Sequence, residues 1–113
     1  MEYEWLDAGV KLYARVGSRE TCNPPPTDTD EDFLVYDRWF YQRSKLQRLG
    51  WENCGDYRGD TKFTAWRKGD LNVICVSDKR YYDKFMEATH LAKKLNLMVK
   101  QQRVDLFEHI MKE

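Results

Sequence analysis

Apolar positions follow first a helix-like and then a strand-like spacing in the N-terminal third of the chain. Residues 3–15 carry apolar side chains at near-helical spacing and Gly17 follows as a stop signal, so we expect a helix here. Three consecutive prolines at 24–26 exclude both a helix and an interior strand from the next segment. The apolar run Phe33–Tyr36 then predicts a short buried strand.

The middle of the chain changes from a helical to an extended pattern. Asp37 is a suitable cap for a helix over about 38–49, which carries apolar side chains on one side. Gly50 ends this helix. The extended segments that follow are separated by glycine-containing turns and cover about 51–56, about 62–67 and about 71–76.

The C-terminal third returns to a helical pattern. Asp78 opens a helix over about 79–95, which ends near Asn96, and a last helix covers about 98–112. The order of these elements predicts one α+β domain over residues 1–113, with a small sheet covered on one side by helices and a C-terminal helical pair.

Charge and cysteine content narrow the class of protein. Lysines and arginines number 19 and aspartates and glutamates 19, so the net charge of zero argues against bulk electrostatic binding of nucleic acid. The sequence shows neither a long apolar stretch nor a signal-peptide pattern, so we expect no membrane span and no export. Three widely spaced cysteines without a CxxC pair suit a reducing cytoplasm and disfavour structural zinc.

A dense acidic block precedes the first predicted strand. Four of the five residues from Asp28 to Asp32 are acidic. If the strand extends back this far, Asp30 and Asp32 point the same way, with Cα atoms about 6.6 Å apart. Two like charges at that distance repel by about 2.5 kcal/mol at an effective dielectric near 20. A divalent cation between them offsets this cost, and Mg²⁺ is commonly held by carboxylates together with substrate phosphates.

A glycine-serine pair lies upstream of the acidic block. Backbone N–H groups at Gly17-Ser18 can approach a phosphate closely, and the Ser18 hydroxyl can donate to it. Taken alone, the pair is typical of a helix end and the acidic block is typical of a solvated loop. Their joint occurrence favours a site for phosphoryl or nucleotidyl transfer.

The spacing of the two motifs carries a resemblance. Val16-Gly17-Ser18 is followed by eleven residues and then by Asp30-Glu31-Asp32 and an apolar run. This resembles the nucleotidyltransferase superfamily related to DNA polymerase beta, in which an apolar residue and Gly-Ser precede Asp-x-Asp by about nine to thirteen residues. The chain also resembles a group of short phage-encoded nucleotidyltransferase-like proteins. The resemblance implies a minimal nucleotidyltransferase-like fold with a small mixed sheet, in the host cytoplasm if the chain is phage-encoded.

The same resemblance implies roles for individual residues. Asp30 and Asp32 would hold Mg²⁺, or Mn²⁺ in its place, while Gly17, Ser18 and Arg19 would hold the phosphates of a nucleoside triphosphate. A nucleotidyl group would pass to a hydroxyl of RNA, a protein or a small molecule, mainly through positioning and charge neutralisation. Two further basic residues that could neutralise a triphosphate near this site are Arg67 and Lys68.

The chain departs from the superfamily pattern at two places. Glu31 stands where the superfamily has an apolar residue, and the frame Asp28-Thr29-Asp30 also fits the spacing. We prefer Asp30 and Asp32, because an apolar strand follows them directly. The second departure is Asn72, which occupies the place of the third carboxylate.

The amide of Asn72 can coordinate Mg²⁺, but it cannot act as a base. Asp70, two positions earlier, could replace it.

Three function classes therefore remain open. The first is an enzyme completed by Asn72 or Asp70, and the second is a catalytically degenerate phage regulator that binds a nucleotide or a host protein. The third is an interaction module whose exposed aromatic side chains dock a partner.

Overall fold

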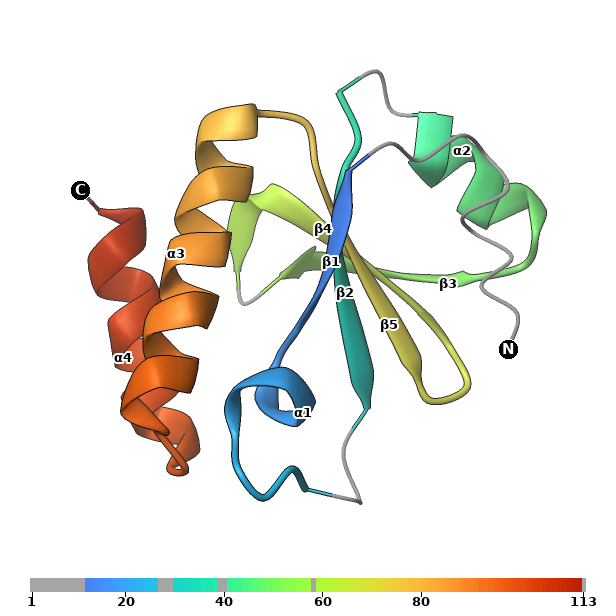
Figure 1. Ribbon diagram of the computed structural model, residues 1–113. Helices are drawn as coiled ribbons and strands as arrows, with labels where there is room; N and C mark the ends of the chain where they lie inside the picture. The colour runs from blue at the N-terminus through green and yellow to red at the C-terminus, as the bar shows by residue number, and fades with distance from the viewer. Residues whose placement is uncertain (1–11, 27–29, 39–40, 58, 113) are drawn as a thin grey trace.

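The computed structural model describes residues 12–26, 30–38, 41–57 and 59–112. Within these ranges the chain folds into a mixed sheet and a set of helices (Figure 1). In chain order the elements are β1 (Tyr13–Val16), α1 (Ser18–Thr21), β2 (Glu31–Tyr36), α2 (Tyr41–Arg48), β3 (Glu52–Tyr57), β4 (Asp60–Lys68), β5 (Leu71–Val76), α3 (Lys79–Leu95) and α4 (Lys100–Met111).

The five strands are arranged in the order β1-β2-β5-β4-β3. β2 and β5 pair in parallel, and the other neighbouring strands pair antiparallel. The parallel register places Asp32 beside Asn72 at the start of the two central strands. The observed α+β class, mixed sheet and C-terminal helical pair agree with the predicted fold.

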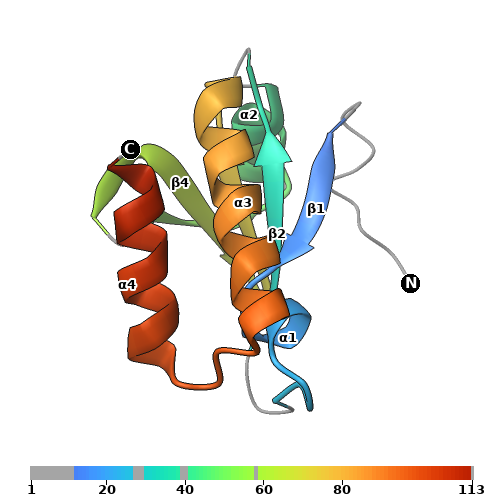
Figure 2. The ribbon, with the colours of Figure 1, turned by 60° about the vertical axis from the view of Figure 1, so that its left-hand side comes forward.

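α3 and α4 lie side by side over one face of the sheet (Figures 1 and 2). Leu34 and Ile74 from the central strands are fully buried under them, together with Phe85 of α3 and Phe107 of α4. The two phenylalanine rings meet edge to face, with centroids 4.9 Å apart. Burying one such side chain stabilises the fold by about 1.5–3 kcal/mol, so this cluster fixes α4 against the sheet.

α2 covers the opposite face of the sheet. Leu46 of α2 is fully buried against Phe33, Val35 and Cys75, and Trp51 is buried in the same cluster. The prediction that helices cover one face only was therefore wrong. The physical reason is visible in β2, where consecutive residues are apolar, so that both faces of the strand need cover.

The predicted helix over residues 3–15 was wrong in its last turn. Tyr13–Val16 is strand β1, which pairs antiparallel with β2, and residues 1–11 lie outside the described ranges. Apolar spacing over so few residues suits either element, and pairing with β2 decides between them. β1 satisfies backbone groups that would otherwise leave β2 as an open edge.

The local signals for helix ends predicted α3 correctly. Asp78 caps α3 by accepting a hydrogen bond from the Arg80 N–H at 2.9 Å, and Asn96 ends it in the left-handed conformation, with φ 48°. α2 begins at Tyr41, and the Asp37 carboxylate accepts a hydrogen bond from the Arg43 N–H in its first turn at 3.2 Å. Among the described residues, no helix is long and apolar enough to cross a bilayer.

Candidate functional site

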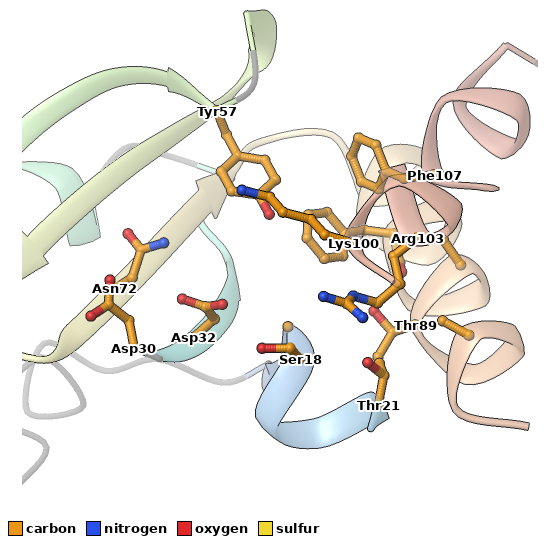
Figure 3. Close-up of a pocket in the computed structure, with 14 residues that line it drawn as sticks. Ser18, Thr21, Asp30, Asp32, Tyr57, Asn72, Thr89, Lys100, Arg103 and Phe107 are labelled. Atoms are coloured by element: carbon orange, nitrogen blue, oxygen red, sulfur yellow. Dashed lines mark hydrogen bonds between the residues drawn. The ribbon is translucent and has the colours of Figure 1, made fainter. Parts of the chain in front are cut away.

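A pocket of about 450 Å³ opens between the sheet and the C-terminal helical pair (Figure 3). It lies at the beginning of β2 and β5, where Asp32 and Asn72 stand side by side. Its wall on the side of α1 and the sheet includes Gly17, Ser18, Asp30, Asp32 and Asn72, and its wall on the side of the helical pair includes Thr89, Lys100, Arg103 and Phe107. The two sequence motifs and the start of β5 thus meet in one concave space.

The Gly17 turn packs directly against Asp32. Gly17 has φ 78° and ψ −176°, a backbone region that is essentially restricted to glycine. A Cβ atom at this position would overlap the Asp32 carboxylate, at 2.9 Å from its Cγ. The absence of a side chain at Gly17 therefore brings Ser18 and Asp32 to the same end of the pocket (Figure 3).

Asp32 and Asn72 are neighbours because β2 and β5 run parallel in register. Alternation along the strands puts both side chains on the face covered by α3 and α4, together with Leu34 and Ile74. Asn72 is half-buried in the pocket wall. Its amide oxygen can coordinate a cation or accept a hydrogen bond, but it carries no charge and takes up no proton.

Asp30 forms an ion pair with Arg67 of β4. Arg67 is the register partner of Asn72, so Asp32, Asn72 and Arg67 form a row across three strands. The charge of Asp30 is offset by this protein cation, although the side chains remain 30% and 46% exposed and the pair contributes about 0–1 kcal/mol. Arg67, one of the basic residues that could neutralise a triphosphate, contacts one of the acids of the pocket.

Three predicted site residues lie away from the described pocket lining. Asp70 is exposed in the turn before β5, where its carbonyl accepts from the Glu31 N–H at 2.9 Å. Arg19 has a buried Nε and does not line the pocket. Lys68 is exposed, with its Nζ 3.4 Å from the Leu49 carbonyl oxygen. The structure therefore brings Gly17 and Ser18 to the acids, but not Arg19, Asp70 or Lys68.

Glu31, the first of the two departures from the superfamily pattern, forms an ion pair with Arg15 of β1 at 2.7 Å. Alternation along β2 directs it to the face opposite Asp32. Its charge is thus used in a contact between strands and not in the pocket. Asp28, the first residue of the other possible frame, lies outside the described residues.

Two basic residues of α4 complete the pocket. Arg103 points from α4 towards Ser18 and Asp32, and Lys100 extends towards Tyr57 (Figure 3). Their spacing of three residues puts both on one face of the helix. That spacing was visible in the sequence, but it is equally typical of a solvated helix face. Only the packing of α4 against α3 shows that this face borders the acids.

Metal binding at this pocket would depend on the ligand as well as on the protein. Among the described residues, no group of three or more histidine, cysteine, aspartate and glutamate side chains is arranged to hold a metal ion. Mg²⁺ can be held by one or two carboxylates together with substrate phosphates. Asp32, Asp30 and the Asn72 carbonyl oxygen therefore fit a metal that arrives with a phosphate ligand.

The thiol of Cys75 lies on the opposite face of the sheet from this pocket. Burial raises the pKa of the Cys75 thiol far above its ordinary value, and the nearby charge of Asp37 raises it further. A thiol in that state is not a nucleophile. Cys75 is therefore a small residue of the core.

Comparisons with known proteins identify the fold. No protein-family model and no curated protein matches the sequence. The structure is similar to the crystal structure of the conserved protein GrpB from Enterococcus faecalis, with a TM-score of 0.63 and 13% sequence identity over 98% of this chain and 94% of that chain. GrpB has a nucleotidyltransferase-like fold. At this identity the likeness shows the fold alone, so this chain has a nucleotidyltransferase-like fold.

Proposed function

We propose that this protein binds a nucleoside triphosphate with Mg²⁺ in the pocket between the start of β2 and β5 and the C-terminal helical pair. One observation carries the proposal: the Gly17 turn is packed against Asp32 within a pocket that also contains Ser18, Asp30 and Asn72. A turn that can cradle a phosphate and carboxylates that can hold its metal are thereby brought to one place.

The residues have distinct roles in this proposal. Asp32 and the amide oxygen of Asn72 would hold the ion, and the Ser18 hydroxyl would donate to a phosphate oxygen. A carboxylate has two oxygens with several acceptor sites, so Asp30 can accept from Arg67 and still contribute to a metal. Mn²⁺ is expected to substitute for Mg²⁺, because both prefer oxygen ligands.

Nucleotidyl transfer is the reaction this arrangement would support. An acceptor hydroxyl would attack the α-phosphorus, forming a new P–O bond while the bond to pyrophosphate breaks. The bound metal would neutralise charge on the phosphates. The hydroxyl proton would pass to Asp30, Asp32 or water, because Asn72 cannot take it.

A second candidate is a nucleotide-binding regulator that does not turn its ligand over. It is favoured by Asn72 in the place of a third carboxylate and by the ion pair that already engages Asp30. In this alternative the bound nucleotide would control contact with another protein, such as a host protein if the chain is phage-encoded.

Calorimetric titration tests the binding proposal. The parent protein should bind at least one nucleoside triphosphate, and the affinity should fall when Mg²⁺ is removed. Asp32→Asn should weaken binding by about tenfold or more, or about 1.4 kcal/mol, because it removes the charge facing the metal. Asp56→Asn, at an exposed acid of β3 outside the pocket, is the matched control and should bind like the parent. Failure of the parent to bind any nucleoside triphosphate would contradict the proposal.

Incubation with labelled nucleoside triphosphates and cellular RNA, protein and metabolites separates the two candidates. Transfer predicts acceptor labelling with release of pyrophosphate, both lost in Asp32→Asn. Binding without labelling would favour the nucleotide-binding regulator over the transferase. If Asp32→Asn labels acceptors as well as the parent, the role given to Asp32 in transfer is wrong.

A further inference from the structure

We propose that α4 supplies the anion-binding wall of this pocket, and that Arg103 and Lys100 make the site selective for a triphosphate over a monophosphate. This rests on the proposed nucleotide binding and adds to it the part of the ligand that the helical pair recognises. Arg103 would contact the distal phosphates directly, and Cys22 would be the positioning residue that holds its guanidinium.

The charges in the pocket are separated between its two walls. Asp30 and Asp32 lie on the sheet side, whereas Lys100 and Arg103 lie on the helix side. Within the described lining, α3 and α4 contribute apolar residues, Thr89 and these two cations, but no acid. A ligand that carries a metal at one end and further negative charge at the other matches this separation. A phosphate chain long enough to reach both walls matches this separation of charges better than a single phosphate does.

The Arg103 guanidinium is held in place by contacts on its Nη1. This atom donates to the Leu97 carbonyl oxygen at 2.8 Å and to the Cys22 sulfur at 3.3 Å. The Cys22 thiol in turn donates to the same Leu97 carbonyl at 3.6 Å. Two contacts on Nη1 fix the plane of the guanidinium, whose other donors belong to Nη2 and Nε. Figure 3 shows that the group is directed towards Ser18 and Asp32.

The segments that hold Arg103 are tied to the α1 region that carries Ser18. The Asn23 N–H donates to the Asn96 side chain at 2.9 Å, and the Asn96 amide donates back to the Asn23 carbonyl at 3.2 Å. Lys93 of α3 forms an ion pair with Glu20 of α1 at 2.6 Å. These contacts join residues more than 70 positions apart, so the α1 region and the end of α3, from which the chain continues into α4, are positioned together.

Arg103→Gln in the full chain tests the inference by comparing mono-, di- and triphosphates of the nucleotide that the parent protein binds best. The loss of affinity should increase with phosphate number, to about tenfold or more for the triphosphate, and should be smallest for the monophosphate. Lys94→Gln removes an equal charge from an exposed position of α3 outside the pocket and should leave all three affinities unchanged.

Substitution of Cys22 tests the positioning role separately. Cys22→Ala removes one of the two acceptors of Arg103 Nη1 and should weaken triphosphate binding more than monophosphate binding. Cys22→Ser keeps a donor and an acceptor at this position and should retain the selectivity. Circular dichroism and thermal unfolding establish that each variant is folded. A variant of Cys22 that changes stability without changing selectivity would contradict this role.

The outcomes distinguish this inference from the proposed function. If the parent binds triphosphate and Asp32→Asn weakens it, but Arg103→Gln binds all three nucleotides like the parent, α4 is not the anion-binding wall. An equal loss for all three nucleotides in Arg103→Gln also overturns the selectivity. If the parent binds no nucleotide at all, the proposed function fails and this inference fails with it.

Discussion

Gly17 and Asp32 illustrate how closely single residues constrain this pocket. The turn can approach the acid only because Gly17 lacks a side chain and adopts a positive φ. Asp30 shows a different situation, since its charge is offset by Arg67 across the sheet. Arg67 therefore offsets part of the repulsion between Asp30 and Asp32, for which the sequence alone suggested a metal ion.

Gly17→Ala should lower the free energy of unfolding by about 1–3 kcal/mol, because alanine is strained in this backbone region. It should also weaken nucleotide binding, because the new Cβ displaces the turn or Asp32. Gly50→Ala is a suitable control, since Gly50 also has a positive φ, of 85°, but a Cβ added there would have no atom within 4 Å. Equal nucleotide affinity for the two variants in calorimetry would contradict the role given to Gly17.

The helices and strands differ in how far local sequence determines them. α3 was predicted with its correct ends, because Asp78 and Asn96 are capping signals that act within one turn of the helix. β1 was not predicted, because its backbone partners come from β2, many residues later in the chain. Local signals thus determine the ends of the long helix α3, whereas pairing with a distant segment determines that β1 forms a strand.

The cap of α3 predicts a pH dependence of stability. Hydrogen bonding from the Arg80 side chain, and then from its backbone, lowers the pKa of Asp78 below its ordinary value. A carboxyl group with a depressed folded-state pKa stabilises the fold above its unfolded pKa, and this contribution is lost as the pH falls through the folded value. Acidification below about pH 4 should therefore remove stability that Asp78 provides at neutral pH.

Asp78→Asn isolates this effect, because asparagine is also a good helix cap but does not titrate in this range. Thermal unfolding of both proteins between neutral and acidic pH should show a steeper loss of melting temperature in the parent below about pH 4. Parallel curves for the two proteins would mean that Asp78 does not contribute in this way.

The candidate site depends on the assembly of the whole chain. Gly17, Ser18, Asp32 and Asn72 could be proposed from the sequence, because the spacing between the Gly-Ser pair and the acidic strand resembles that of a known superfamily. Arg103 and Lys100 could not be assigned, because their place in the pocket depends on how α4 packs against α3 and the sheet. The aromatic contacts that fix this packing are formed by Phe63, Phe85 and Phe107.

A crystal structure grown with Mn²⁺ and a non-hydrolysable nucleoside triphosphate tests the proposed site most directly, because anomalous scattering locates the metal. The proposal predicts a manganese peak at the Asp32 carboxylate, with phosphates between Ser18 and Arg103. Nucleotide bound elsewhere on the protein, or a pocket without metal at saturating ligand, would contradict it.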